Sequence, residues 1–281
     1  MTFRKMWFSP ALALATAAYL LAFVPSSFPI ALPFLAAWFT APYIVFRVSQ
    51  PLPHYKKLIN ENQKLYLREI SRKTWGFFEN LVSIEDNWLP PDNIQYYPIP
   101  VIAHRTSPTN IGMSLLANLA ACDFGYITPT QLVQRTSNTF QTLEKMERFE
   151  GQFYNWYDTQ TIQPLHPKYV STVDSGNLAG HLLTLRQGLL AQADEKVLHH
   201  KYISGLYDVV RIINNILPPE DQKLFTDLLH HFKAANSFTT IRQYKTFLDD
   251  SLERYYDVLS KITPEPKSDA FHWFTALESQ L

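Results

Sequence analysis

Residues 104–112 read His-Arg-Thr-Ser-Pro-Thr-Asn-Ile-Gly, and this run predicts where a helix of the chain begins. Serine is preferred at the position before a helix, and proline is favoured at the first helical position, where no backbone N–H is needed. Ser107 and Pro108 therefore predict a helix start. Gly125 predicts its end, because glycine readily adopts the left-handed conformation that closes a helix.

Apolar residues recur at helical spacing through the rest of the chain after residue 50. The spacing and caps predict helices over about 54–82, 107–125, 128–146, 174–189, 202–216, 224–232, 241–259 and 268–281, with Asp174 and Ser268 as caps. The buried side of the first is expected to hold Tyr55, Leu58, Ile59, Tyr66, Ile70, Phe77, Phe78 and Leu81, and that of the third Leu132, Val133, Phe140, Leu143 and Met146. Residues 153–172 predict a short hairpin or extended loop.

Two further polar runs follow the first one along the chain. Residues 155–158 read Asn-Trp-Tyr-Asp, and residues 173–181 read Val-Asp-Ser-Gly-Asn-Leu-Ala-Gly-His. All three runs lie beside predicted helix starts or loops, and loops often carry functional side chains. Each run also has a structural alternative: a helix start, a hairpin with an aromatic core residue, or a helix cap at Asp174.

The three runs hold the chemical groups that a carbohydrate cleft uses. Carboxylates, amides and guanidinium groups bond to sugar hydroxyls, and aromatic faces cover the apolar side of a pyranose ring. The candidate substrate-binding residues are Trp88, His104, Arg105, Asn110, Trp156, Tyr157, Asp158, Asp174 and Asn177. Packing in the core is the alternative role for the three aromatic residues, and a structural hydrogen bond is the alternative for His104.

In order and spacing, the three runs resemble the middle region of bacterial cyclic β-1,2-glucan synthases, from about Lys73 to about Leu190. The resemblance implies an (α/α)6 toroid whose inner helices and loops line a glycan cleft, with β-1,2-glucan as partner. It further implies a retaining transglycosylase, which needs two carboxylates about 5–5.5 Å apart. In the family the catalytic glutamates lie on later segments that this chain does not contain. Asp158 is thus only a weak catalytic candidate, and no catalytic residue is assigned.

The resemblance also predicts a truncated domain. Family members usually carry a glycosyltransferase domain before this region and a phosphorylase-like domain after it. Residues 104–281 are therefore expected to form the N-terminal part of a toroid, inactive alone, with the remaining synthase domains as a separate partner chain. The alternative is a non-catalytic, membrane-anchored glycan-binding or structural remnant.

The N-terminus predicts a membrane hairpin within residues 1–50. Residues 6–46 carry no charged side chain, and residues 25–29, Pro-Ser-Ser-Phe-Pro, break this stretch into segments 7–24 and 30–46. Each segment is near the lower limit for crossing a bilayer. Positive residues flank both ends, which favours a cytoplasmic body at the bacterial inner membrane. A cleaved signal peptide is the alternative. Residues 51–103 are expected to form a long linker helix and a proline-rich loop.

Composition sets further expectations. The chain of 281 residues carries 25 basic and 25 acidic side chains, so its charge gives no reason to expect nucleic acid as a partner. Its one cysteine, Cys122, excludes an internal disulfide. The nine histidines lack metal-ligand spacing, and no phosphate-binding or dinucleotide motif occurs, so no metal and no cofactor are expected.

Overall fold

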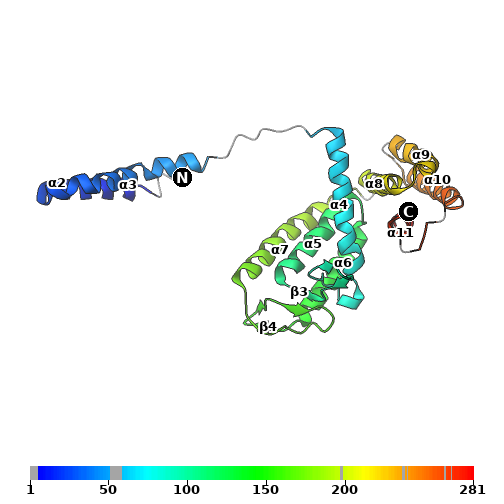
Figure 1. Cartoon of the computed structure of the whole chain (residues 1–281), viewed down its shortest axis with the longest axis horizontal. Helices are drawn as coiled ribbons and strands as arrows, with labels where there is room; N and C mark the ends of the chain where they lie inside the picture. Colours follow the sequence, from blue (N-terminus) through cyan, green and yellow to red (C-terminus); the bar gives the residue numbers. More distant parts are fainter. Residues whose placement is uncertain are drawn as a thin grey trace. The chain divides into compact units, whose positions relative to one another are not determined.

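The computed structural model describes residues 6–50, 59–196, 199–235, 238, 240–262, 264–266 and 268–281. The chain divides into two compact units, Met1–Ile59 and Asn60–Leu281. Helices make up most of the described residues of both units, and each described strand is two residues long (Figure 1). The predicted all-α class is confirmed.

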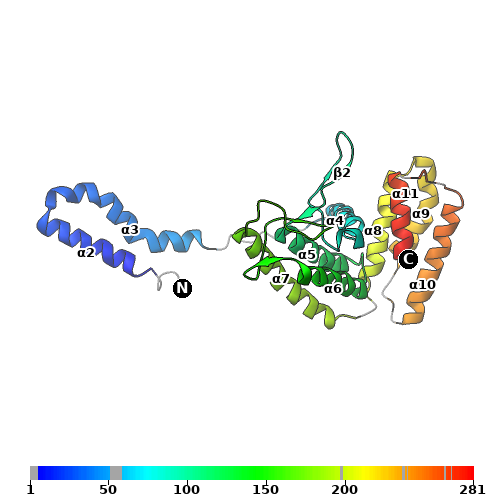
Figure 2. The same cartoon turned by 90° about the horizontal axis from the view of Figure 1, so that it is seen from below.

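The N-terminal unit is a pair of apolar helices. Helix α2 (Phe8–Phe23) and helix α3 (Phe28–Val48) are joined by a short 3-10 turn, Pro25–Ser27, and lie side by side (Figure 2). The Ser9 hydroxyl donates to the Trp38 carbonyl across the pair at 2.8 Å. By length and composition, Pro25–Val48 is the one described helical segment able to cross a membrane, while α2 is shorter.

The second unit begins with helix α4 (Glu61–Leu81), which starts at a capping box. Asn60 accepts from the Gln63 backbone N–H at 2.9 Å, and Gln63 accepts from the Asn60 N–H at 3.1 Å. This cap satisfies two backbone donors at the helix start. The predicted start near residue 54 falls in 51–58, outside the described residues, as do Tyr55 and Leu58.

The predicted buried face of α4 is wrong for Ile59, Tyr66 and Ile70. Ile59 precedes the helix, and all three side chains are exposed. The buried face holds Arg72 and Trp75 instead. Apolar spacing does not predict this face, because the inward side is occupied by an arginine whose charge is paired with Glu79.

Three helices follow α4 around a first core: α5 (Pro108–Phe124), α6 (Pro129–Lys145) and α7 (Thr172–Ala193), with α5 and α7 side by side (Figure 1). Ser107 and Thr128 cap α5 and α6 as predicted. For α7 the prediction is wrong, because Ser171 is the cap and Asp174 lies inside the first turn. Val133, predicted to be buried, is exposed on α6.

Four helices form a second core: α8 (Lys201–Ile216), α9 (Pro219–Ala234), α10 (Ile241–Leu259) and α11 (Asp269–Gln280) (Figure 2). Ser268 caps α11 as predicted. In the first core α5 packs mainly against α7, and in the second core α8 packs against both α9 and α11. Trp75 and Leu89, from the region predicted as a linker, belong to the first core together with residues of α5 to α7.

Three antiparallel strand pairs lie between the helices: β1 (Ile94–Gln95) with β2 (Val101–Ile102), β3 (Arg105–Thr106) with β6 (Tyr157–Asp158), and β4 (Arg148–Phe149) with β5 (Gln152–Phe153). The β3–β6 pair joins the first and second polar runs. The hairpin or extended loop predicted over 153–172 is present, because Tyr157 forms an antiparallel bridge with Pro164 and the Leu165 N–H donates to the Trp156 carbonyl at 2.9 Å. The pairing of β6 with β3 is an additional contact to the segment before α5.

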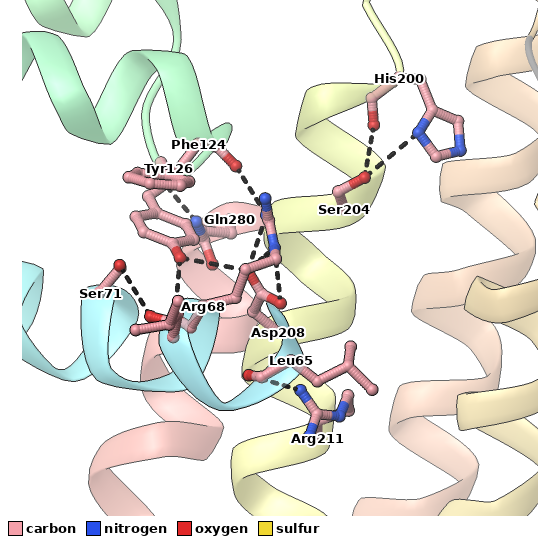
Figure 3. Close-up of polar contacts among 11 residues, drawn as sticks. Leu65, Arg68, Ser71, Phe124, Tyr126, His200, Ser204, Asp208, Arg211 and Gln280 are labelled. Carbon is pink, nitrogen blue, oxygen red and sulfur yellow. Dashed lines mark hydrogen bonds and ion pairs between the residues drawn. The ribbon is translucent and has the colours of Figure 1, made fainter. Parts of the chain in front are cut away.

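A buried ion pair joins α4 to α8 (Figure 3). Arg68 Nε lies 3.0 and 2.8 Å from the two carboxylate oxygens of Asp208, and Arg68 Nη2 lies 2.7 Å from Oδ2. The same Nη2 donates to the Phe124 carbonyl at 3.1 Å, and the Tyr126 hydroxyl lies 3.1 Å from Asp208 Oδ2. Burial raises the pKa of Asp208, and the Arg68 guanidinium opposes that rise.

A second arginine of α4 is enclosed by aromatic rings. Arg72 is fully buried, and its Nη1 lies 2.8 Å from Glu79 Oε2. Its guanidinium carbon lies 5.4 Å from the centre of the Tyr126 ring and 5.2 Å from that of the Trp273 ring. Because Asp208 belongs to α8 and Trp273 to α11, the two arginines connect α4 to two helices of the second core.

We expect Arg68→Met to lower the free energy of unfolding by about 3–5 kcal/mol, because it leaves the buried Asp208 carboxylate without its cation. Lys245→Met is the matched control, since it breaks an exposed pair with Asp249 and should cost less than about 1 kcal/mol. Urea unfolding of the full chain in detergent, followed by tryptophan fluorescence, measures both. Equal losses in the two variants would contradict the bridging role of Arg68.

Candidate functional site

The site is built around Arg105 on β3. In the β3–β6 register Arg105 lies opposite Asp158. Arg105 Nε and Nη2 donate to Asp92 Oδ2 at 3.1 and 2.9 Å. Its guanidinium carbon lies 5.0 Å from the centre of the Trp156 ring, so Arg105 stacks on an aromatic residue of the second polar run. About half of the Arg105 side chain is exposed.

Asp92 is the carboxylate that holds this side of the site together, although the sequence did not single it out as a site residue. Its Oδ1 accepts from Asn110 Nδ2 at 3.3 Å, and its Oδ2 accepts from Asn93 Nδ2 at 3.0 Å as well as from Arg105. Asp92 therefore fixes Arg105 relative to the first turn of α5, where Asn110 lies.

Asp174 on α7 is the carboxylate that bonds α7 to α5. Its Oδ1 accepts from the Thr109 hydroxyl at 2.6 Å, and Asn177 Nδ2 donates to the same hydroxyl at 3.1 Å. Thr109 lies on α5, whereas Asp174 and Asn177 lie on α7. The third polar run is thus bonded directly to the first.

Asn155 completes the connection between the runs. With its amide turned to satisfy every neighbour, Asn155 donates to Asp174 Oδ2 at 2.8 Å. Its oxygen then accepts from the Tyr169 hydroxyl at 2.5 Å and from the Trp156 indole N–H at 2.7 Å. The opposite orientation would set the amide oxygen against the Asp174 carboxylate, which repels it. Arg105, Trp156, Asn155 and Asp174 form one continuous chain of contacts.

Asp158 has a structural task. Its Oδ1 accepts from the backbone N–H groups of Gln160 and Thr161, at 3.0 and 2.7 Å, and from the Thr161 hydroxyl at 2.9 Å. This pattern closes a turn directly after β6. One carboxylate oxygen of the weak catalytic candidate is therefore engaged in holding the loop.

Tyr157 is a core residue, and its prediction as a substrate contact is wrong. Its side chain is completely buried, and its hydroxyl donates to the Glu147 carbonyl at 2.7 Å. Burial raises the pKa of Tyr157 to about 12. The strand alternation explains the difference, because Tyr157 points to the opposite side from its neighbours Trp156 and Asp158.

His104 is oriented by a buried carboxylate that the sequence did not identify as a partner. His104 Nδ1 lies 2.7 Å from Asp86 Oδ1, and the Thr159 hydroxyl donates to the same oxygen at 2.5 Å. Asp86 is buried, while more than a third of the His104 side chain is exposed. The pair holds the imidazole in one orientation at the edge of the site.

Trp88 lies apart from the chain of contacts around Arg105. Its backbone is in the left-handed region, with φ of 60°. Arg135 of α6 lies 5.9 Å from the Trp88 ring centre and 5.1 Å from that of Trp75. These contacts support packing against α6 as the role of Trp88.

The described residues contain no group of three histidine, cysteine or acidic side chains placed to hold a metal. Cys122 is buried in the first core, and burial raises the pKa of its thiol. The chemistry that the site offers is therefore hydrogen bonding from charged and amide groups beside a partly exposed indole. That combination suits a polyhydroxylated ligand.

The chain is 40% identical over 226 residues to the cyclic beta-(1,2)-glucan synthase NdvB of Rhizobium meliloti (strain 1021). The resemblance to cyclic β-1,2-glucan synthases is confirmed. The match covers 79% of this chain but only 8% of the synthase, so the chain spans a small part of that relative. No protein-family model matches the chain.

Among solved structures, a glucoamylase-like protein from Bacteroides fragilis NCTC 9343 matches with a TM-score of 0.33 and 15% sequence identity. The match covers 65% of this chain and 37% of that one. A TM-score of this size is too low to establish a shared fold. The similarity to the cyclic glucan synthases therefore stands on sequence.

Gly112 and His181, the last residues of the first and third polar runs, meet where α5 and α7 pack. A methyl group placed on Gly112 would lie 2.3 Å from His181 Nδ1, closer than any tolerated contact. At Gly176, in the same third run, an added methyl group meets no atom within 4 Å. The close approach of α5 and α7 explains why a glycine stands at position 112.

Gly112→Ala should therefore destabilise the chain by about 1–3 kcal/mol, because α7 must shift to admit the methyl group. Gly176→Ala is the matched control and should stabilise the chain by up to about 1 kcal/mol through helix propensity. The shift in the urea midpoint of the full chain measures both. A gain in stability for Gly112→Ala would show that α5 and α7 do not pack this closely.

Proposed function

We propose that the second unit, Asn60–Leu281, which we call the body of the chain, binds linear β-1,2-glucan as a segment of a cyclic β-1,2-glucan synthase. The observation that carries the proposal is the continuous chain of contacts from Asp92 through Arg105, Trp156 and Asn155 to Asp174. It brings side chains from three separate polar runs to one place. The sequence similarity to a synthase of this class supports glucan as the ligand.

The contacts support binding because they fix the polar groups before the ligand arrives. Arg105 is held by Asp92 yet remains half-exposed, and Asn177 is exposed beside Thr109. Groups that are already oriented lose little conformational entropy on binding. The partly exposed Trp156 offers an apolar surface beside them, which suits the face of a sugar ring.

The same contacts support binding without catalysis. A retaining transglycosylase needs a nucleophilic carboxylate and a second carboxyl group as acid/base. In this site Asp158 holds a turn, Asp174 accepts from Thr109 and Asn155, and Asp86 is paired with His104. We therefore propose that this part of the protein contributes glucan binding and needs other synthase segments for transglycosylation. The second candidate function is that of a non-catalytic, membrane-anchored glycan-binding or structural remnant. It is favoured by the same observation, because each of these carboxylates is already hydrogen-bonded to other protein groups.

We expect the detergent-solubilised full chain to bind linear β-1,2-glucan, and Arg105→Met to weaken binding by about tenfold or more through loss of a charged donor. Arg242→Met is the matched control, because Arg242 is an exposed arginine on α10 outside the site. Isothermal titration calorimetry measures both, and circular dichroism checks that the variants are folded. Equal binding by wild type and Arg105→Met would remove Arg105 from the site.

The products of the same incubation test the absence of catalysis. Mass spectrometry should detect neither cyclic nor shortened glucan after prolonged incubation. Products that form with the wild type and vanish with Asp158→Asn would assign catalysis to Asp158 and overturn the proposal of binding alone.

We further propose that α2 and α3 cross the bacterial inner membrane as a hairpin and leave the body in the cytoplasm. Most side chains of both helices are apolar and exposed within the unit, as expected for contact with lipid rather than water. Two crossings return the chain to its starting side, and the flanking basic residues favour the cytoplasmic side.

Carbonate extraction and cysteine labelling test this placement. The chain should stay in the membrane fraction at alkaline pH. A Lys245→Cys reporter, at an exposed position, should react with a membrane-impermeant maleimide in inverted vesicles and not in intact spheroplasts. Labelling in spheroplasts would place the body outside the cytoplasm, and release by carbonate would rule out the hairpin.

A further inference from the structure

The β1–β2 hairpin, residues 94–102, is an arm with exposed apolar side chains at its tip. Figure 2 shows β2 in a segment that projects from the helical body. Tyr96 is 74% exposed, Tyr97 is 90% exposed and Ile99 is 66% exposed. Exposed apolar groups clustered on a projecting element mark a surface for contact with another molecule.

The base of this arm is part of the site described above. The Asp92 N–H donates to the Ala103 carbonyl at 3.1 Å, and the Ala103 N–H donates to the Asn93 carbonyl at 3.0 Å. The same Asp92 holds Arg105 and Asn110 through its carboxylate. The arm and the candidate glycan-binding residues are therefore anchored by a single residue.

We propose that the arm is a second glycan-binding element, with Tyr96 and Tyr97 stacking on a β-1,2-glucan chain that extends beyond the Arg105–Trp156 site. The inference rests on the proposed function. Tyrosine suits this task, because its ring covers the apolar face of a sugar while its hydroxyl bonds to water or to sugar oxygens.

The charge and length of the arm support a neutral, extended ligand. Residues 93–103 contain no charged side chain, whereas attraction to anionic lipid requires lysine or arginine. The tip lies about five residues from Asp92, which corresponds to roughly 15 Å along a strand. A short sugar bound at Arg105 does not span that length, and only a longer glucan reaches both places.

Titration with glucans of two lengths tests the arm. We expect Tyr96→Ala combined with Tyr97→Ala to weaken binding of long linear β-1,2-glucan by about tenfold, from the loss of two aromatic contacts. Binding of the β-1,2-linked disaccharide and trisaccharide should remain as in the wild type. Tyr66→Ala is the matched control, because Tyr66 is a similarly exposed tyrosine on α4. The full chain in detergent is used throughout, and circular dichroism confirms folding.

The outcomes separate failure of the arm from failure of the site. If the double variant binds long glucan as tightly as the wild type, the arm is not a glycan-binding element. If the wild type binds neither long nor short glucan, the proposed function itself fails and the arm inference fails with it. An equal loss for short and long glucans in the double variant would show that the arm acts by distorting the Arg105 site, which also overturns the inference.

Discussion

The ion pair between Arg68 and Asp208 is the interaction on which the arrangement of the body depends (Figure 3). The body has two hydrophobic cores, one around α5 to α7 and one around α8 to α11. Helix α4 packs against both α5 and α8. A buried pair of this kind contributes little net stability compared with apolar packing, because both charges lose their hydration. What it does is penalise every arrangement in which the guanidinium and the carboxylate do not meet. Tyr126 and the Phe124 carbonyl add to that penalty, since they lie at the end of α5 and bond to the same two groups.

The first core in turn holds the candidate site, and the site depends on two close contacts between α5 and α7. Gly112 admits His181, and the Thr109 hydroxyl bonds to Asp174. These contacts explain why the first and third polar runs are rich in small and polar residues. A bulky residue at 112 would separate the helices, and the Asp174 carboxylate would lose its neutral donor. The polar side chains are therefore held by helix packing as well as by hydrogen bonds, which keeps them oriented without a ligand.

Features encoded within a few residues were predictable from the sequence. Helix starts are predicted by Ser107 with Pro108, by Thr128 with Pro129, and by Ser268, because a cap bonds to a backbone N–H only two or three residues ahead.

Features that depend on partners far along the chain were not predictable from the sequence. Asp174 was expected to cap α7, yet Ser171 does so and Asp174 faces Thr109 on another helix. The inward face of α4 does not follow from local spacing, because Arg72 is buried between Tyr126 and Trp273, which lie far along the chain. The roles of Asp92 and Asp86 are not predictable for the same reason. Asp92 bonds to Arg105 and Asp86 to His104, and these partners come close only in the folded chain.

Residues 92–112 carry, one after another along the chain, most of the groups proposed to contact a glucan. Asp92 is followed by the projecting hairpin, then by Arg105 on β3, then by the capped start of α5. A single stretch of chain therefore carries the exposed tyrosines, the guanidinium and the helix that packs on α7. Asp92 bonds to Arg105 and Asn110 through its carboxylate and to Ala103 through its backbone N–H, so one residue contacts both Arg105 and the base of the hairpin. If glucan binds at both places as proposed, the two contacts are linked through the continuous backbone and the Asp92 carboxylate. The proposed arrangement would then favour a long flexible chain over a small sugar, because only a long chain gains contacts at both places for one loss of translational freedom.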